Sequence, residues 1–276
     1  MSRPLQIEGC GTAHSPPAHP PIIKDENGEE PPMNRLFDPT VYPKSFKPAE
    51  MTVSWDGWTL LACPDSQVQC ASCKNHPFHR GCVVIGVSAK CLNNSEPPKC
   101  AIGVFYGMKN VLNVASEIKE APFTEQVAIL RACIIALTHI ISNCQVTKPK
   151  KGNEMAFPLH TVVIRSDSPY LVQGVTEWMP KWKLNGWKTA KGQPVANESM
   201  WRLIDVWIRQ LEPEVLVQFW HVPKNINFPA SYLTLYGLHG PKDSDGSSPG
   251  FMKLTDSSEK KEKSNKKKGN KKQSRD

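Results

Sequence analysis

The chain has 276 residues, of which 39% are hydrophobic, enough for one folded domain with long tails. Its net charge is +8, but the last twenty residues, from Ser257 on, hold nine Lys or Arg and three acidic residues and supply +6 of it. The rest is nearly neutral, so any basic surface on the folded part has to be local. Neither a secretory signal nor an apolar run of about 20 residues is found, which argues against secretion and membrane insertion.

Both ends of the chain are predicted to be disordered. Residues 1–50 contain ten of the 25 prolines and lack periodic apolar positions, and residues 241–276 form a lysine-rich tail. Such a tail is typical of a polyanion-binding or nuclear-targeting segment, and equally of a solvated, solubilising end. We therefore expect an intracellular protein, and the tail favours the nucleus over the cytoplasm.

The folded part begins with apolar, β-branched segments. Residues 51–64 are predicted to form a short strand or an irregular packed segment, and 82–91, 100–107 and 110–118 to form three consecutive strands. The strongest helix signal covers 124–143, where Thr124 can cap the first turn. Its apolar stripe recurs with helical period at Val127, Leu130, Ile134, Leu137 and Ile141.

The second half alternates strands and helices. Residues 160–168 and 214–223 are predicted strands, and 169–178 and 197–212 are predicted helices. The order β-β-β-α-β-α-α-β predicts an α/β fold, a mixed five-stranded sheet with helices on both faces. We place this single domain at residues 82–240, after a Cys- and His-rich lead-in at 51–81.

Four local motifs carry a resemblance to a known family. They are VVIRSDSPYLVQGVTEW, a strand ending in Ser-Asp-Ser before a short helix; WMPKWKLNGWKTAKGQPVAN, a basic protrusion rich in tryptophan; FWHVP in the last strand; and AIGVFYG followed by TEQVAILRA in the first hairpin and helix. Together they resemble the type-1 ribonuclease H domain over roughly residues 82–240. The resemblance implies a ribonuclease H-like fold.

The resemblance also implies which residues would carry the chemistry. Members of this family hydrolyse phosphodiesters with two Mg²⁺ ions held by four carboxylates. Here Asp167 matches the third of these acids, whereas the other three positions fall on Val87, Ile129 and Leu235. A single carboxylate binds Mg²⁺ only weakly and cannot fix a pair of ions. The resemblance therefore favours a catalytically inactive member, a pseudoenzyme, in which Mg²⁺ is a cofactor only if activity persists.

The binding surface is better kept than the metal site. The resemblance implies nucleic-acid contacts at Thr124, Trp178, Trp182 and Asn197, and the charge of the protrusion adds Lys181, Lys183 and Lys188. Lysines contact phosphates and release counterions, and indole faces stack on bases or sugars. Trp187, Trp201 and Trp207 fit equally well as core aromatics.

A Cys- and His-rich segment precedes the resembling region. Cys70, Cys73, His79 and Cys82 have spacings that allow a structural zinc site, although the second pair is compressed. The alternative is a loop of free thiols. The odd number of nine cysteines favours free thiols in a reducing compartment, with Cys91, Cys100, Cys133 and Cys144 as small core residues.

The sequence thus predicts a monomer that binds nucleic acid, an RNA–DNA hybrid or a related duplex, without hydrolysing it. Two alternatives stay open, an active hybrid endonuclease with an altered metal site and a protein-interaction module. A membrane partner is not expected.

Overall fold

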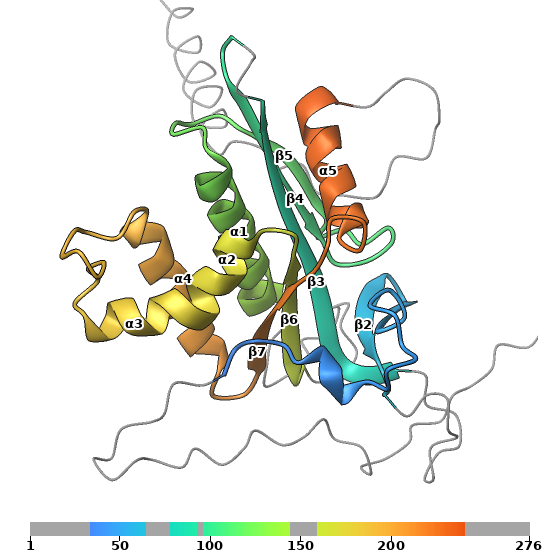
Figure 1. Ribbon diagram of the computed structural model, residues 1–276. Coiled ribbons are helices and arrows are strands. Elements are labelled where there is room, and N and C mark those ends of the chain that lie inside the picture. Colours follow the sequence, from blue (N-terminus) through green and yellow to red (C-terminus); the bar gives the residue numbers. More distant parts are fainter. Residues whose placement is uncertain (1–33, 65–77, 93–95, 144–158, 241–276) are drawn as a thin grey trace, which may run out of the picture.

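The computed structural model describes residues 34–64, 78–92, 96–143 and 159–240 (Figure 1). A seven-stranded mixed sheet forms its centre. The strands are β1 (Thr52–Trp55), β2 (Trp58–Ala62), β3 (Phe78–Leu92), β4 (Lys99–Phe105), β5 (Val114–Ile118), β6 (Thr161–Ser166) and β7 (Leu216–His221). The helices are η1 (Pro39–Val41), α1 (Glu125–Asn143), α2 (Pro169–Gln173), η2 (Gly174–Trp178), α3 (Met179–Leu184), α4 (Glu198–Leu211) and α5 (Phe228–His239).

The long strand β3 organises the sheet. Its first half pairs in parallel with β6, Cys82–Val87 against Thr161–Ser166, and its second half pairs with β4 in antiparallel register. β7 lies parallel to β6 on one outer side, and β5 lies beside β4 on the other. The hairpin of β1 and β2 pairs with the beginning of β3, on the side that β4 occupies further along. These two strands raise the expected number from five to seven.

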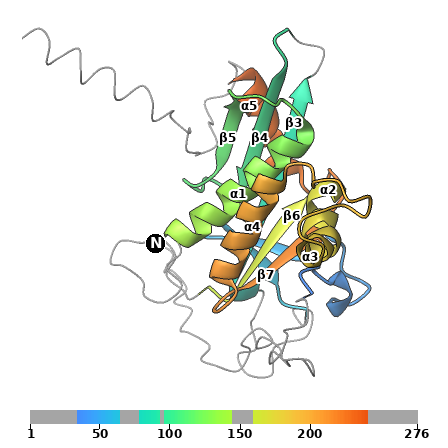
Figure 2. The ribbon, with the colours of Figure 1, turned by 90° about the vertical axis from the view of Figure 1, so that its left-hand side faces the viewer.

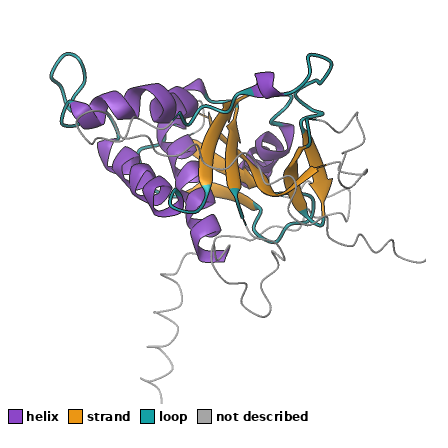
Figure 3. Ribbon diagram, turned by 90° about the horizontal axis from the view of Figure 1, so that it is seen from below, coloured by secondary structure: helices purple, strands orange, loops and turns teal. Residues whose placement is uncertain are grey.

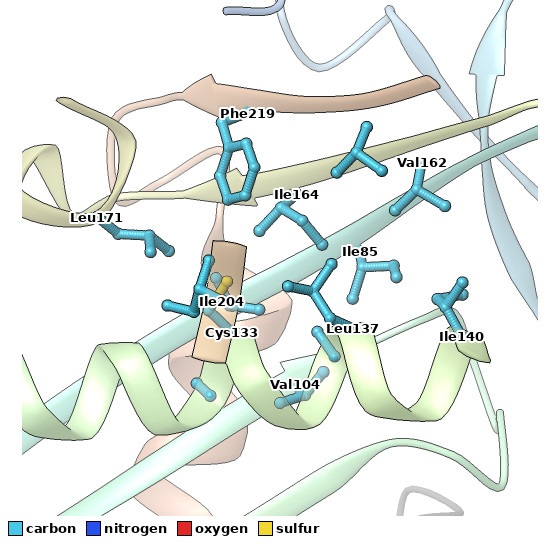
Figure 4. Packing of buried hydrophobic residues seen from close by; sticks show 14 of the residues in the cluster. Ile85, Val104, Cys133, Leu137, Ile140, Val162, Ile164, Leu171, Ile204 and Phe219 are labelled. Carbon is cyan, nitrogen blue, oxygen red and sulfur yellow. The ribbon is translucent and has the colours of Figure 1, made fainter. Parts of the chain in front are cut away.

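Helices cover both faces of the sheet. α1 and α4 pack on one face, and α5 packs on the other against β3, β4 and β5 (Figures 2 and 3). The main core lies under α1, where Leu137 and Ile140 meet Ile85 and Val104 of the sheet (Figure 4). Val127, Leu130 and Leu137 of the predicted stripe are buried, whereas Ile134 and Ile141 are only half-buried, because the buried face of the helix also includes Cys133, Ala136 and Ile140. α5 was absent from the predicted element order.

α1 is also long and apolar enough to cross a membrane by length and composition, over Glu125–Ser142. Half of that window is buried inside the domain. In this structure the helix is the central core helix of a sheet-based domain, a kind of helix that passes the same test. Its composition follows from that burial.

The N-terminal strap, residues 35–46, covers the other face of β6 and β7. Phe37 stacks obliquely on Trp220, and Tyr42 donates a hydrogen bond from its hydroxyl to the Ala62 carbonyl at 2.8 Å. The backbone of the strap also bonds to β7, with Phe37 N donating to Phe219 O at 2.9 Å. The prediction of disorder for residues 1–50 is thus wrong for 34–50. The strap folds because Phe37 and Tyr42 pack on apolar residues far away in the sequence, such as Trp220. A local sequence pattern does not predict such contacts.

One cysteine pair also differs from the expectation of free thiols. Cys91 and Cys100 face each other across β3 and β4 and form a disulfide. Cys82 and Cys133 are free thiols, and like Cys63 they are buried. Cys144 lies outside the described residues.

The strap is held by a nearly buried ion pair. The Arg35 guanidinium donates two hydrogen bonds to the Glu212 carboxylate, at 2.7 and 3.0 Å, and the two side chains are only 10% and 12% exposed. Glu212 follows α4, so the pair ties residues 177 positions apart. A bidentate pair with this little solvent is a strong link once both partners are present.

We predict that Glu212→Gln lowers the free energy of unfolding by roughly 2–3 kcal/mol, because the guanidinium stays buried without its counter-charge. Urea denaturation measures this. The double variant Arg35→Met with Glu212→Gln removes both charges and is expected to lose less than the sum of the losses in Arg35→Met and Glu212→Gln alone. Losses that simply add in the double variant would contradict the coupling.

Candidate functional site

Asp167 directly follows β6 and is half-buried at the end of the sheet. Its carboxylate accepts a hydrogen bond from Asn227 Nδ2 at 2.8 Å, and the same amide donates to the Val87 carbonyl at 2.9 Å. Asn227 is fully buried and immediately precedes α5. Both N–H groups of one amide thus join the acid to β3 and to the start of α5.

The neighbouring positions on β3 are small. Gly86 lies beneath Asn227, since a Cβ placed on it would come within 3.0 Å of Asn227 Oδ1. Ser88 is buried and its hydroxyl lies 3.3 Å from that of Ser231 on α5. Because strand side chains alternate, Gly86 and Ser88 share one face and Val87 points to the other. The face of Asp167 therefore presents an amide and two hydroxyls.

The three positions at which the sequence places lost carboxylates do not surround Asp167. Val87 and Ile129 are buried in the core under α1. Leu235 is 40% exposed and lies eight residues after Asn227, roughly 12 Å further along the axis of the helix. The residue at the start of α5 that contacts Asp167 is Asn227, which the sequence did not single out. The alternation of side chains along β3 could have predicted that Gly86 and Ser88, and not Val87, lie on the face of Asp167.

These residues do not fit a two-metal site. Mg²⁺ requires several anionic oxygens in near-octahedral geometry, and the described residues hold no group of three or more His, Cys, Asp or Glu side chains that could bind a metal. The Asn227 amide presents N–H donors to Asp167, which is the opposite polarity to a metal ligand. No step through a metal can be derived from this donor set.

A second group of residues forms the protrusion, which we define as residues 178–197. It begins on the bent helix formed by α2, η2 and α3, which extends away from the sheet (Figure 1). Gly174 starts the π-helical turn η2, and a Cβ there would come within 2.1 Å of the Trp201 ring. Glycine is therefore needed for the fully buried indole of α4 to lie against this helix.

Four aromatic rings lie in sequence at the base of the protrusion. Trp178 and Trp182 have ring centroids 5.9 Å apart, and Trp182 and Trp201 are 5.6 Å apart. Tyr170 contacts both Trp178 and Trp201. Trp201 is enclosed, whereas Trp178 and Trp182 keep part of their surface in solvent. The two residues predicted to contact nucleic acid are thus the accessible members of a rigid aromatic group.

The lysines of the protrusion fall into two kinds. Lys181, Lys188 and Lys191 are exposed, and no described residue forms an ion pair with any of them. Lys183 instead bonds to Asp205 at 3.0 Å, an acid that is buried and also paired with Arg209. Lys183 therefore fastens the protrusion to α4 and is less available to a phosphate than the sequence suggested.

The turn of the protrusion has an unusual backbone. Trp187 has φ 61°, in the left-handed region that bulky residues rarely adopt, and follows Gly186 at φ 60°. Its N–H bonds to the Trp182 carbonyl at 2.6 Å, and Arg202 lies over its ring at 4.5 Å. Trp187 and Trp201, two of the tryptophans that the sequence left open as core aromatics, are both buried and are therefore structural residues.

Thr124 and Asn197 lie at the starts of α1 and α4. Thr124 Oγ1 accepts a hydrogen bond from Val127 N at 3.2 Å, which confirms the predicted cap. Asn197 has φ 58° and donates from its amide to the Tyr170 hydroxyl at 3.2 Å. Asn197 is thereby positioned by the aromatic group rather than by its own helix.

Most of the predicted zinc ligands cannot be placed. Cys70, Cys73 and the side chain of His79 lie outside the described residues. Cys82 starts the parallel pairing of β3 and its thiol is buried in the core. Burial raises the pKa of this thiol to about 11, so without a bound metal it is protonated at neutral pH.

A mixed sheet with β3 parallel to β6, helices on both faces and an aspartate at the end of β6 defines a ribonuclease H-like α/β domain. The family comparison agrees, because the family described as RNase H matches residues 83–223, a little over half of the chain. The chain belongs to the ribonuclease H family.

Individual relatives match to different extents. Ribonuclease H of Alcanivorax borkumensis is 30% identical over 128 residues, which cover 46% of this chain and 72% of the relative. Ribonuclease H of Cyanothece is 50% identical over 44 residues, 16% of this chain and 28% of the relative. For relatives matched over such short segments, including that of Bordetella avium with 34% of its length, the chain spans well under half of the relative.

Solved structures show lower similarity. A foamy viral protease-reverse transcriptase in complex with dsDNA is 19% identical with a TM-score of 0.43, covering 57% of this chain and 94% of that chain. LC9-RNase H1, described as a type 1 RNase H with the type 2 active-site motif, is 21% identical with a TM-score of 0.40, covering 60% and 76%.

The Asn227–Asp167 contact predicts a new pH dependence for Asn227→Asp. Two carboxyls in this buried contact raise the pKa of the introduced acid, so the native state keeps a proton that the unfolded chain releases. Stability should therefore fall as the pH rises from about 4 towards 7. Added Mg²⁺ or Mn²⁺ should restore part of it, because a cation can replace that proton.

Denaturation measured between pH 4 and 7 tests this, with Asn227→Ala as the matched control. The alanine variant loses the same two hydrogen bonds but adds no charge, so its stability curve should run parallel to that of the native chain. An Asn227→Asp curve that also ran parallel would show that the two side chains are not in contact.

Proposed function

We propose that this chain binds a nucleic-acid duplex, such as an RNA–DNA hybrid, through the protrusion, and that it does not hydrolyse the bound strand. The observation that carries the proposal is the Asn227 amide on the carboxylate of Asp167. Family membership supports the duplex as the ligand. The two halves of the proposal, binding and absence of hydrolysis, rest on different residues.

Binding is supported by the aromatic and basic composition of the protrusion. Trp178 and Trp182 offer partly exposed rings fixed by their neighbours, so little side-chain entropy is lost when a base or sugar stacks on them. Exposed lysines nearby supply phosphate contacts whose strength falls with added salt. Such an interface reads the backbone and shape of the duplex more than its sequence.

Absence of hydrolysis is supported by the donor set around Asp167. Two-metal hydrolysis needs carboxylates that neutralise both ions and set their separation. Asp167 is bonded instead to the Asn227 amide, which lies over Gly86, and the same face of β3 and α5 carries the hydroxyls of Ser88 and Ser231. A pair of divalent cations at this point would repel each other without compensating anions.

The decisive experiment combines a cleavage assay with a binding assay on the full chain. With a labelled RNA–DNA hybrid in Mg²⁺ and in Mn²⁺, we expect retardation in a gel and no cleavage products. Robust turnover that Asp167→Asn abolished would establish the active endonuclease instead. Absence of any retardation at low salt would favour a protein-interaction module.

The two kinds of lysine give a matched pair of variants. Lys181→Met removes an exposed cation and should weaken hybrid binding severalfold, with the slope of log affinity against log salt smaller by about 1. Lys183→Met removes the partner of buried Asp205, so its main effect should be a lower unfolding midpoint, with a smaller change in the salt slope.

Both variants are measured by fluorescence anisotropy against salt and by thermal denaturation. Equal losses of salt slope in the two variants would contradict the assignment of Lys183 to the fold. An unchanged affinity after Lys181→Met and Lys188→Met together would show that the protrusion is not the binding surface.

A further inference from the structure

A buried arginine lies near Asp167 and has no role in the proposed interface. Arg165 is only 4% exposed, and its Nε is enclosed without a hydrogen-bond partner. Within the described part of the chain its guanidinium forms no ion pair. Burial alone lowers the pKa of this guanidinium to about 10, so it keeps its charge at neutral pH. An unpaired buried charge is costly, and such costs are usually offset by a ligand or counter-ion.

The surroundings of Arg165 are known from the sheet register. It pairs with Gly86 on β3 and with Trp220 on β7, and it shares a face with Asp167 two residues later. Asn227 Oδ1 lies directly over Gly86 and is also buried without a partner. A donor and an acceptor without partners thus lie on the same face, over adjacent strands.

The start of α5 adds positive potential at this place. α5 is twelve residues long, its N-cap Asn227 makes no side-chain capping bond, and its first turn contains no acid. Pro229 in the first turn has no N–H, but the remaining N–H groups and the helix dipole favour an anion there. The loop leading into α5, residues 222–227, carries Lys224 and no acidic residue. The carboxylate of Asp167, which also lies at this end of the sheet, is already bonded to Asn227.

We propose that Arg165, together with the N-terminal turn of α5, forms a phosphate-binding site that needs no metal ion. The buried guanidinium of Arg165 provides the positive charge of this site. Free phosphate suits both unpartnered atoms, because its oxygens accept from Arg165 and its protonated oxygen donates to Asn227 Oδ1. A backbone phosphate carries no proton, so it accepts from Arg165 and reaches Asn227 Oδ1 only through a bound water. The site takes either free phosphate or, resting on the proposed function, a backbone phosphate of the bound duplex.

Thermal denaturation with inorganic phosphate tests the site without any nucleic acid. At a phosphate concentration several times its Kd, we expect the Tm of the native chain to rise by roughly 2–4 °C relative to chloride of equal ionic strength. Arg165→Met retains most of the side-chain volume and removes the charge, and should abolish this rise. Lys99→Met, at the exposed start of β4, is the control and should leave the rise intact.

Hybrid binding by Arg165→Met, measured with EDTA present, separates the two sources of phosphate. If EDTA leaves the hybrid affinity of the native chain unchanged and Arg165→Met lowers that affinity severalfold, the ligand is a backbone phosphate. An unchanged affinity with a lost phosphate response identifies free phosphate as the ligand. The proposal is overturned if the native chain shows no phosphate-specific rise in Tm, or if Arg165→Met retains it. Failure of hybrid binding in every variant would refute the proposed function but leave the phosphate response as a separate result.

Discussion

The parallel register between β3 and β6 is the constraint on which the rest of the molecule depends. It sets Gly86 beside Arg165 and Val87 beside Ser166, and because strand side chains alternate it decides which residues face Asp167. A shift of one residue would move Val87 out of the core under α1 and bring Ser88 into it. The apolar core and the polar site are therefore fixed by the same pairing, and neither could change register without the other.

Much of the fold could be predicted because its central elements have strong periodicity. The strands that became β4 and β6 and the helices that became α1 and α4 were placed within a few residues of their bounds. The strap could not be predicted, since Phe37 and Tyr42 are isolated aromatics in a Pro-rich stretch and pack only on distant residues such as Trp220. The close packing of η2 on α4 likewise depends on the contact of Gly174 with Trp201, which lies 27 positions away.

The site was predicted where the signal was local and missed where it depended on loop length. Asp167 is embedded in a continuous strand-to-helix motif, so its position followed from neighbouring letters. Leu235 was reached by counting across the loop after β7, and a count through a loop carries no geometric constraint. α5 here presents Asn227 at its first turn instead. Charge was also visible in the sequence, but the engagement of Lys183 with buried Asp205 was not, because the two belong to different helices.

The strap has a further consequence for association between chains. An outer strand of a sheet leaves a row of backbone N–H and C=O groups to which a foreign strand can add. On β7, Phe219 already donates to the Arg35 carbonyl and accepts from Phe37 N, and Leu36 pairs with it as a parallel bridge. The side of β7 opposite β6 is thus sealed by the chain's own backbone around Phe219, which blocks intermolecular strand addition at this edge.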